Sequence, residues 1–165
     1  MSEPNSDLQH IHELLTGFST AMLVTHAGGD RLRARPMALA DVGETCRMFF
    51  LSSRESGKIH EIENDKRVQI VCQKDYGAYL SIDGRARMID DHAEVARVWK
   101  ESYRTWFPGG KTDPEIVLIV VEPFEAEYWD NTGGNKVRYL WEAARAYVTG
   151  DKPHISEGQH GVVKL

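Results

Sequence analysis

The stretch Phe49-Phe50-Leu51-Ser52-Ser53-Arg54-Glu55-Ser56-Gly57-Lys58 carries the clearest structural signal in the chain. Its apolar first half predicts the end of a strand, and its hydroxyls and glycine predict a change of backbone conformation. Downstream, Ile59 and Ile62 lie on one side of an expected helix. Ser53 would cap this helix, and Asn64 would lie near its end. The stretch therefore predicts a strand that runs directly into a helix.

The start of this helix is a candidate phosphate site. Free N–H groups and the positive end of the helix dipole meet there. Four side chains add donors and positive charge, namely Ser53, Arg54, Ser56 and Lys58. The glycine spacing of a Walker loop is missing. The competing interpretation is an ordinary, solvated helix start.

Apolar, β-prone runs separated by turn residues predict strands on both sides of this junction. The expected strands are Thr20 to His26, Arg31 to Ala40, Thr45 to Ser52, Val68 to Gln73, Ala78 to Ile89, Glu115 to Glu122 and Phe124 to Trp129. Their connections are short turns or short helices, which favours an antiparallel, barrel-like sheet over alternating parallel βαβ units.

Three further helices are expected around this sheet. The first ends near Gly17, the second follows Asp90 or Asp91, and the last runs from Val137 to Val148. A stripe of large side chains marks the second helix, formed by Val95, Val98, Trp99, Tyr103 and Trp106. Packing in the core or at a subunit interface explains this stripe better than a cofactor site. The polar tail, residues 151–165, is expected to be disordered or to lie along a partner subunit.

Composition excludes several classes of protein. With 20 Lys plus Arg against 25 Asp plus Glu and a net charge of -5, the chain lacks the positive charge with which proteins bind nucleic acids. No apolar run is long enough for a membrane helix, and the N-terminus does not resemble a signal peptide. We therefore expect a cytoplasmic protein with one domain over residues 1–165. Cys46 and Cys72 are expected to be buried, reduced thiols, and the scattered histidines predict no metal site.

A second candidate for anion binding lies in the strand before the junction. Arg31, Arg33 and Arg35 alternate along it, so their side chains share one face. Pro36 and Met37 follow, and the proline predicts an edge, a bulge or a position that faces a ligand. The arginines could be solvated, or they could hold an anionic cofactor beside an apolar ring.

Four segments in this order resemble the pyridoxamine 5'-phosphate oxidase-like, flavin-binding split barrels. They are Arg35-Pro36-Met37, the Phe49 to Lys58 stretch, Glu61-Ile62-Glu63-Asn64 with Arg67, and Glu127-Tyr128-Trp129. Within that superfamily the chain is most similar to the bacterial general stress proteins. The similarity extends from about Thr20 to Trp129.

The resemblance implies a mainly β fold with peripheral helices, namely a six-stranded antiparallel split β-barrel. It also implies a homodimer with one FMN in each of two grooves at the subunit interface. Arg35 matches the arginine that holds the FMN phosphate in this family, and Ser56 and Lys58 match its phosphate segment. The flavin edge and ribityl chain would be lined by Pro36, Met37, Phe50, Leu51 and Ser52. Trp129 matches a tryptophan near the flavin of the partner, although a purely packing role for it is equally compatible with its sequence.

Departures from the family pattern argue against true pyridoxamine phosphate oxidation. The substrate-binding segment that follows the tryptophan in those oxidases is replaced by Gly133-Gly134 and a run containing Lys136 and Arg138. Tyr79 stands where a glutamine is expected, and the C-terminal arginine-proline ending is absent. Flavin-dependent oxidoreductase chemistry is one hypothesis. The alternatives are a non-catalytic flavin sensor or buffer, and a split barrel that binds deazaflavin or haem.

Overall fold

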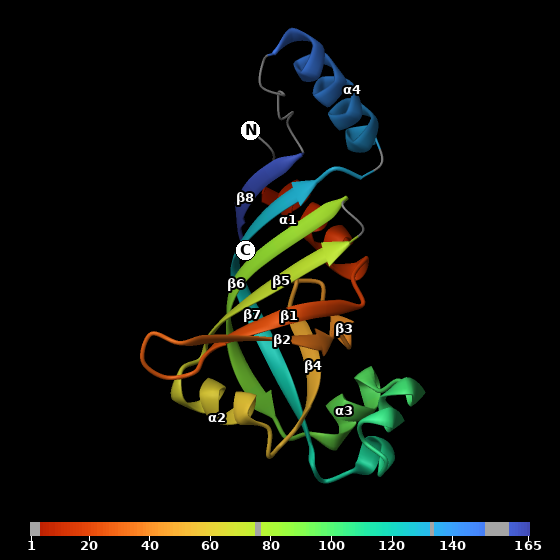
Figure 1. The fold of residues 1–165 in the computed structure, drawn as a ribbon. Coiled ribbons are helices and arrows are strands. Elements are labelled where there is room, and N and C mark those ends of the chain that lie inside the picture. Colours follow the sequence, from red (N-terminus) through yellow and green to blue (C-terminus); the bar gives the residue numbers. More distant parts are fainter. Residues whose placement is uncertain (1–3, 75–76, 133, 151–158) are drawn as a thin grey trace.

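The computed structural model describes the backbone of residues 4–74, 77–132, 134–150 and 159–165. Figure 1 shows a strongly curled antiparallel sheet with helices placed around it. In chain order the elements are α1 (Pro4–Thr16), β1 (Thr20–His26), β2 (Leu32–Ala38), β3 (Asp41–Val42), β4 (Met48–Ser53), α2 (Gly57–Asn64), β5 (Arg67–Lys74), β6 (Ala78–Ile89), α3 (His92–Val98), the 3-10 turns η1 (Glu101–Thr105) and η2 (Gly110–Thr112), β7 (Ile116–Asp130), α4 (Gly134–Thr149) and β8 (His160–Lys164).

The sheet has the strand order β2-β1-β5-β6-β7-β4-β3, and β8 pairs with the other end of β7. The predicted mainly β, antiparallel architecture is thus confirmed. The strand number is corrected, because the described residues form an 8-stranded sheet rather than a six-stranded one. The sequence analysis did not anticipate the short β3 and the C-terminal β8.

The inner face of the curled sheet holds the main core. Apolar residues alternate along the strands, so one set points inward, and Leu23, Ile70 and Ile82 are completely buried. Helix α1 packs against this core through Ile11 and Leu15. The hydrophobic alternation thus fixes which face of each strand points inward.

The first half of β7 is buried on both faces. Ile119 faces the main core, whereas Leu118 and Val120 pack in a second cluster beneath α3 and η1. A strand that is covered on both faces has a continuous run of apolar residues in its sequence, and residues 116–121 show this pattern.

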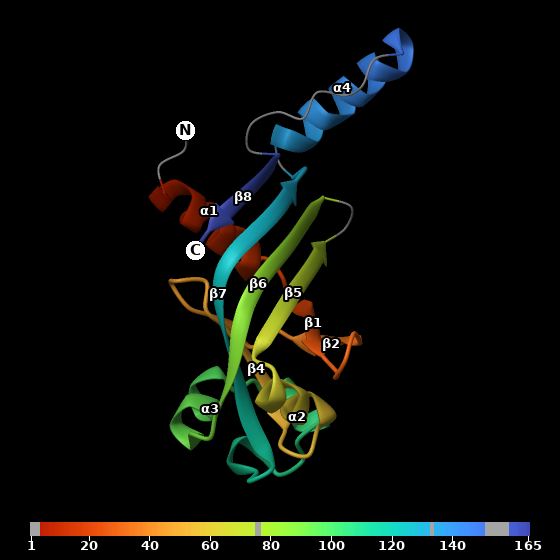
Figure 2. The ribbon, with the colours of Figure 1, turned by 90° about the vertical axis from the view of Figure 1, so that its left-hand side faces the viewer.

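The predicted break between two strands at Pro123 is wrong, since β7 continues through it. The proline is accommodated by a β-bulge, in which Asp83 pairs with Glu125 while Gly84 pairs with Pro123. Phe124 is therefore the extra residue of the bulge. The bulge changes the register without ending the strand, so β7 is long enough to connect the two ends of the molecule (Figure 2).

Two expectations about helices also need correction. Ser56, not Ser53, is the N-cap residue of α2, and its side chain makes no capping hydrogen bond. The helix after Asp91 ends at Val98, because Trp99 has an extended backbone with ψ of 135°. The aromatic stripe expected on one helix is consequently divided between α3 and the separate turn η1.

The expected tail is in part a strand. Residues 160–164 form β8, which pairs antiparallel with β7 of the same chain and places Val163 against the main core. The expectation of disorder is therefore wrong for these residues, and contact of the tail with a partner subunit stays a prediction. Residues 151–158 lie outside the described residues. In the described part of the chain, no helix has the length and apolar character that crossing a membrane requires.

The bulge generates a stability prediction at Gly84. A Cβ atom there would lie 2.7 Å from Val121 Cγ1 and 2.9 Å from the Glu122 carbonyl oxygen. We expect Gly84→Ala to lower the free energy of unfolding by about 1–3 kcal/mol, because backbone must move to admit the methyl group. Gly57→Ala is the control, since a Cβ at Gly57 meets nothing within 4 Å. Urea unfolding that gave equal midpoints for the two variants would contradict the prediction.

Candidate functional site

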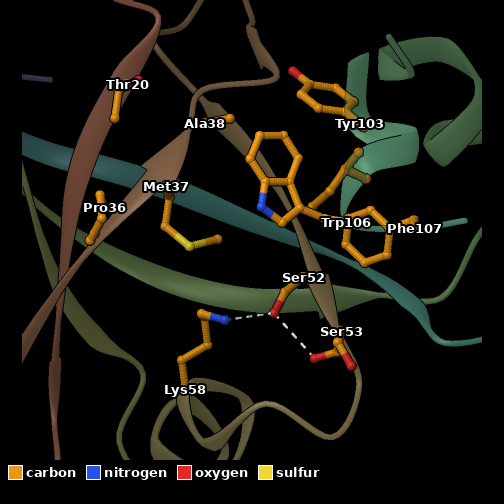
Figure 3. A pocket seen from close by; sticks show the side chains of 11 residues that line it. Thr20, Pro36, Met37, Ala38, Ser52, Ser53, Lys58, Tyr103, Trp106 and Phe107 are labelled. Atoms are coloured by element: carbon orange, nitrogen blue, oxygen red, sulfur yellow. Dashed lines mark hydrogen bonds between the residues drawn. The ribbon is translucent and has the colours of Figure 1, made fainter. Parts of the chain in front are cut away.

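The curled sheet does not close between β2 and β4. The backbone N–H of Ala40 donates to the Phe49 carbonyl at 2.9 Å, but β2 and β4 are not neighbours in the hydrogen-bonded strand order. A cavity of about 540 Å³ lies in this region (Figure 3). Its lining consists of Thr20, Pro36, Met37, Ala38, Leu51, Ser52, Ser53, Lys58, Tyr103, Trp106 and Phe107. The site thus draws on both sides of the gap, on α2 and on η1.

One end of the cavity is polar and positively charged. Lys58 Nζ donates to Ser56 Oγ at 2.5 Å and to Ser52 Oγ at 3.1 Å (Figure 3 draws the second bond). The Ile59 N–H donates to the Ser56 carbonyl at 2.9 Å, but the Ser56 side chain caps no helix N–H, so the N–H groups of Gly57 and Lys58 remain available to a ligand or to water. This end offers an ammonium, two hydroxyls and a helix N-terminus, which are the groups that bind a phosphate.

Within the described residues, Lys58 has no carboxylate within salt-bridge distance. Partial burial and the nearby charge of Arg35 lower the pKa of Lys58, and the charge of Glu61 opposes this shift only in part. A cation that has lost some of its hydration beside a second cation is stabilised by a bound anion. The electrostatics at Lys58 therefore favour an anionic ligand.

The second cation, Arg35, is held near Lys58 by a network of hydrogen bonds and ion pairs. Its Nη2 lies 2.7 Å from Glu61 Oε2, and its Nη1 donates to Thr25 Oγ1 at 2.8 Å. Arg33 Nη1 lies 2.7 Å from Glu61 Oε1, and Thr25 Oγ1 donates to Glu61 Oε2 at 2.5 Å. Arg33 and Arg35 thus share one face, as predicted, but both point to Glu61. Arg31 lies at the β1–β2 turn and donates to the Ala27 carbonyl instead.

The network affects the ionisation of Glu61. Burial of Glu61, whose side chain is only 11% exposed, would raise its pKa. The hydrogen bonds from Thr25 and Arg35 and the charges of both arginines outweigh burial and lower the pKa of Glu61. One carboxylate thus balances one of the two arginines. With Lys58, this region keeps an excess of positive charge.

The other end of the cavity is aromatic. Tyr103 is buried, whereas Trp106 is 68% exposed, and its indole projects from the end of η1 toward Met37 (Figure 3). Trp99 packs against these aromatic side chains. Its ring centre lies 5.9 Å from that of Tyr103 and 6.5 Å from that of Phe107. Sequence reasoning missed this aromatic wall, because it placed these side chains on one continuous helix that packs in the core or at a subunit interface.

Most of the predicted site residues gather in this cavity. Pro36, Met37, Leu51, Ser52 and Lys58 line it. Pro36 lies on β2, the edge strand, where its missing N–H is tolerated.

Four predicted residues do not line the cavity, namely Arg35, Phe50, Ser56 and Trp129. Ser56 touches the site through Lys58, and Arg35 acts on Lys58 by its charge. The side chain of Phe50 is completely buried in the main core, so only its backbone is left for a ligand.

Trp129 lies far along β7 from this cavity. It is 37% exposed on the outer face of the sheet, and its ring stacks on that of His160 with 5.2 Å between the ring centres. His160 Nε2 in turn lies 2.8 Å from Glu127 Oε1. The single chain therefore does not bring Trp129 to the site. The side chains of Lys136 and Arg138 lie outside the described residues.

The cysteines are structural. Cys46 and Cys72 are buried, and burial raises the pKa of their thiols to about 11 and about 12. Such thiols are protonated and unreactive at neutral pH. Among the described residues, no group of three His, Cys, Asp or Glu side chains is arranged to hold a metal ion.

Comparison with known proteins identifies the family. The model of the family described as pyridoxamine 5'-phosphate oxidase like matches residues 6–154. The chain belongs to this family. Its fold is accordingly a split barrel, and the relatives to which it is similar include general stress proteins.

Three of these relatives define the similarity. General stress protein 26 of Bacillus subtilis (strain 168) is 35% identical over 77 residues, which are 44% of this chain and 54% of that protein. The chain thus matches about half the length of this curated relative. A crystal structure of a candidate general stress protein 26 from Jannaschia sp. CCS1 has a TM-score of 0.74 at 24% identity and covers 97% of this chain and 99% of that one, which shows the fold. The general stress FMN/FAD binding protein of Xanthomonas citri has a TM-score of 0.66 at 27% identity and covers 78% of this chain and 92% of that one.

The network around Glu61 leads to a prediction for the variant Glu61→Gln. We expect the variant to be about 1–3 kcal/mol less stable at pH 7, because it loses charge-assisted hydrogen bonds from two arginines. Since the pKa of Glu61 is lowered by folding, its contribution is complete above the ordinary value of 4.5 and is lost as the pH falls through the folded-state pKa.

The measurement is urea unfolding of both proteins from pH 7 down to pH 3. The control is Glu63→Gln, which removes an exposed carboxylate of the same helix, 3.3 Å from His60 Nδ1, and should change stability little. A stability difference between wild type and Glu61→Gln that did not shrink in acid would show that the carboxylate charge is not responsible.

Proposed function

We propose that this protein binds FMN in the cavity between β2 and β4, with the phosphate at Lys58 and the flavin ring at the aromatic end. One observation carries the proposal: a single cavity has at one end a partly buried ammonium, which donates to two serine hydroxyls, and at the other end an aromatic wall. FMN has the same polarity, because a phosphate and a planar ring lie at opposite ends of a flexible chain. The cavity volume of about 540 Å³ falls within the range of about 300–1,000 Å³ typical of small-molecule sites.

The charge balance supports a phosphate monoester. Arg33, Arg35 and Lys58 face a single carboxylate, Glu61. Of these four groups, only Lys58 lines the cavity, so a phosphate would bind at its ammonium, while the arginine pair contributes through its field. A phosphate here would also accept hydrogen bonds from the first turn of α2. The name of the Xanthomonas citri relative, an FMN/FAD binding protein, agrees with this assignment.

FMN, when bound, supplies hydride or electron transfer, and the protein supplies its position and electrostatic environment. In this chain, Lys58, Ser52 and Ser56 would fix the phosphate, and Met37, Leu51 and the aromatic wall would orient the ring. We propose a flavin-dependent oxidoreductase as the activity. A non-catalytic flavin-binding module is the second candidate, favoured by a cavity that contains, among the described residues, no charged side chain except Lys58 to bind a charged substrate.

We also propose a homodimer that completes the cofactor site. Pro36, which lines the cavity, pairs with Met22, and Met22 pairs with Val71. These directly opposed residues share the outer face of the sheet, where Met22 and Val71 remain 36% and 37% exposed. Trp129 lies on the same face at the far end of β7. A two-fold axis across this face would bring the far end of one β7 toward the cavity of the other subunit.

Lys58→Ala tests the phosphate assignment. We expect about 10- to 100-fold weaker FMN binding, because a charge-assisted hydrogen bond to phosphate is lost. Riboflavin, which has no phosphate, should bind equally to wild type and variant. Lys66→Ala, which removes an exposed lysine outside the cavity, is the control. The dissociation constants are measured by equilibrium dialysis, and the assignment fails if a folded Lys58→Ala variant still prefers FMN to riboflavin as strongly as wild type does.

Val71→Glu tests the dimer. A carboxylate on the outer face would be desolvated in the proposed interface, so we expect dissociation to monomers and weaker FMN binding. Val71→Ala keeps the face apolar and should remain dimeric. Sedimentation velocity at several concentrations distinguishes the two states. Dimers of Val71→Glu with unchanged affinity would place the subunit contact elsewhere.

A further inference from the structure

Trp106 is a large aromatic side chain left exposed inside the cavity. It is 68% exposed and lines the cavity, whereas the similarly exposed Trp141, at 70%, lies on α4 and does not. Within the described residues, its indole N–H has no hydrogen-bond acceptor. Exposed aromatic surface in a concave wall is characteristic of a ligand-binding surface.

The position of Trp106 is fixed by the turn that carries it. The backbone N–H groups of Trp106 and Phe107 both donate to the Tyr103 carbonyl, each at 3.0 Å. Trp99 packs edge-on against Tyr103 and also contacts Phe107. Arg104 pairs with Glu101 across the same turn. The exposed indole therefore belongs to a packed segment and is presented to the cavity by its neighbours.

The Trp106 side chain points into the same cavity that Lys58 lines from the other side. Its ring projects toward Met37 on β2, and Lys58 lies on the other side of the cavity (Figure 3). A molecule held by its phosphate at Lys58 would extend its planar end past Leu51 and Met37 toward this indole.

We propose that Trp106 is the stacking surface for the isoalloxazine ring, an inference that rests on the FMN site proposed above. Tyr103 and Phe107 hold the indole at the edge of the site, and the indole covers part of one face of the ring. Stacking of this kind adds affinity through dispersion and through the complementary charge distributions of the two rings. It also leaves the opposite face of the flavin as the side from which a second molecule must approach.

Two variants separate stacking from electronic contact. Trp106→Phe keeps an aromatic ring but removes the electron-rich indole, which quenches flavin fluorescence when the two rings touch. Trp106→Leu removes the aromatic ring as well. Trp141→Phe is the matched control, because it alters an equally exposed tryptophan outside the cavity. Trp129→Phe tests whether the tryptophan assigned to the partner subunit is the quencher instead.

For each variant, FMN affinity is measured by equilibrium dialysis and the lifetime of bound FMN by time-resolved fluorescence. Circular dichroism confirms that each variant is folded. We expect Trp106→Phe to bind FMN with near wild-type affinity but with a longer fluorescence lifetime. We expect Trp106→Leu to bind about two- to tenfold more weakly, with the same longer lifetime. Trp141→Phe should match wild type in both measurements.

The outcomes separate this inference from the proposed function. If wild type binds FMN through Lys58 but the lifetime in Trp106→Phe is unchanged, the stacking role is overturned while the FMN site stands. A longer lifetime in Trp129→Phe alone also overturns it. If wild type binds no FMN, both proposals fail.

Discussion

The gap between β2 and β4 is the constraint on which the site depends. If the sheet closed here, the backbone N–H and C=O groups of β2 and β4 would pair with each other, and strand backbone would fill the space of the cavity. Instead, β2 contains Pro36, which cannot donate to a neighbouring strand, and β4 leads into α2. The chain thus leaves a cavity that is lined in part by residues of β2 and β4. A site built on strands holds its side chains more precisely than one built on loops.

The charges around this gap follow from the same geometry. The face of β2 that carries Arg33 and Arg35 turns toward α2, where Glu61 accepts hydrogen bonds from both. The first turn of the same helix carries Lys58, whose ammonium donates to hydroxyls rather than to a carboxylate. The single carboxylate on α2 therefore balances one of the two arginines, and Lys58 near the start of the helix adds a further positive charge. A ligand with two negative charges would balance the remaining charge of this region.

Local sequence signals predicted the polar half of this site and missed the aromatic half. The Phe49 to Lys58 stretch is contiguous, so the predicted strand-to-helix junction was sufficient to place Ser56 and Lys58 near each other, and the family resemblance added Ser52. The orientation of the Arg35 side chain depends on Glu61, which is 26 residues away in sequence, and only the tertiary structure shows this pair. Trp106 was assigned to a helical stripe because periodicity does not reveal that Trp99 adopts an extended backbone and ends the helix. The strand count was wrong for a similar reason, since β8 is short and depends on pairing with β7.

The two halves of the site also differ in how they are stabilised, and this difference bears on function. The polar end is held by strand and helix backbone and by a partly buried ion network, which makes it a fixed anchor. The aromatic end belongs to a segment of short turns held by side-chain packing among Trp99, Tyr103 and Phe107. Segments of this kind open at lower free energy than core strands do. In the proposed FMN complex the ring would therefore lie against the wall that opens more readily, so exposure of the ring to a second molecule could vary while the phosphate stays bound.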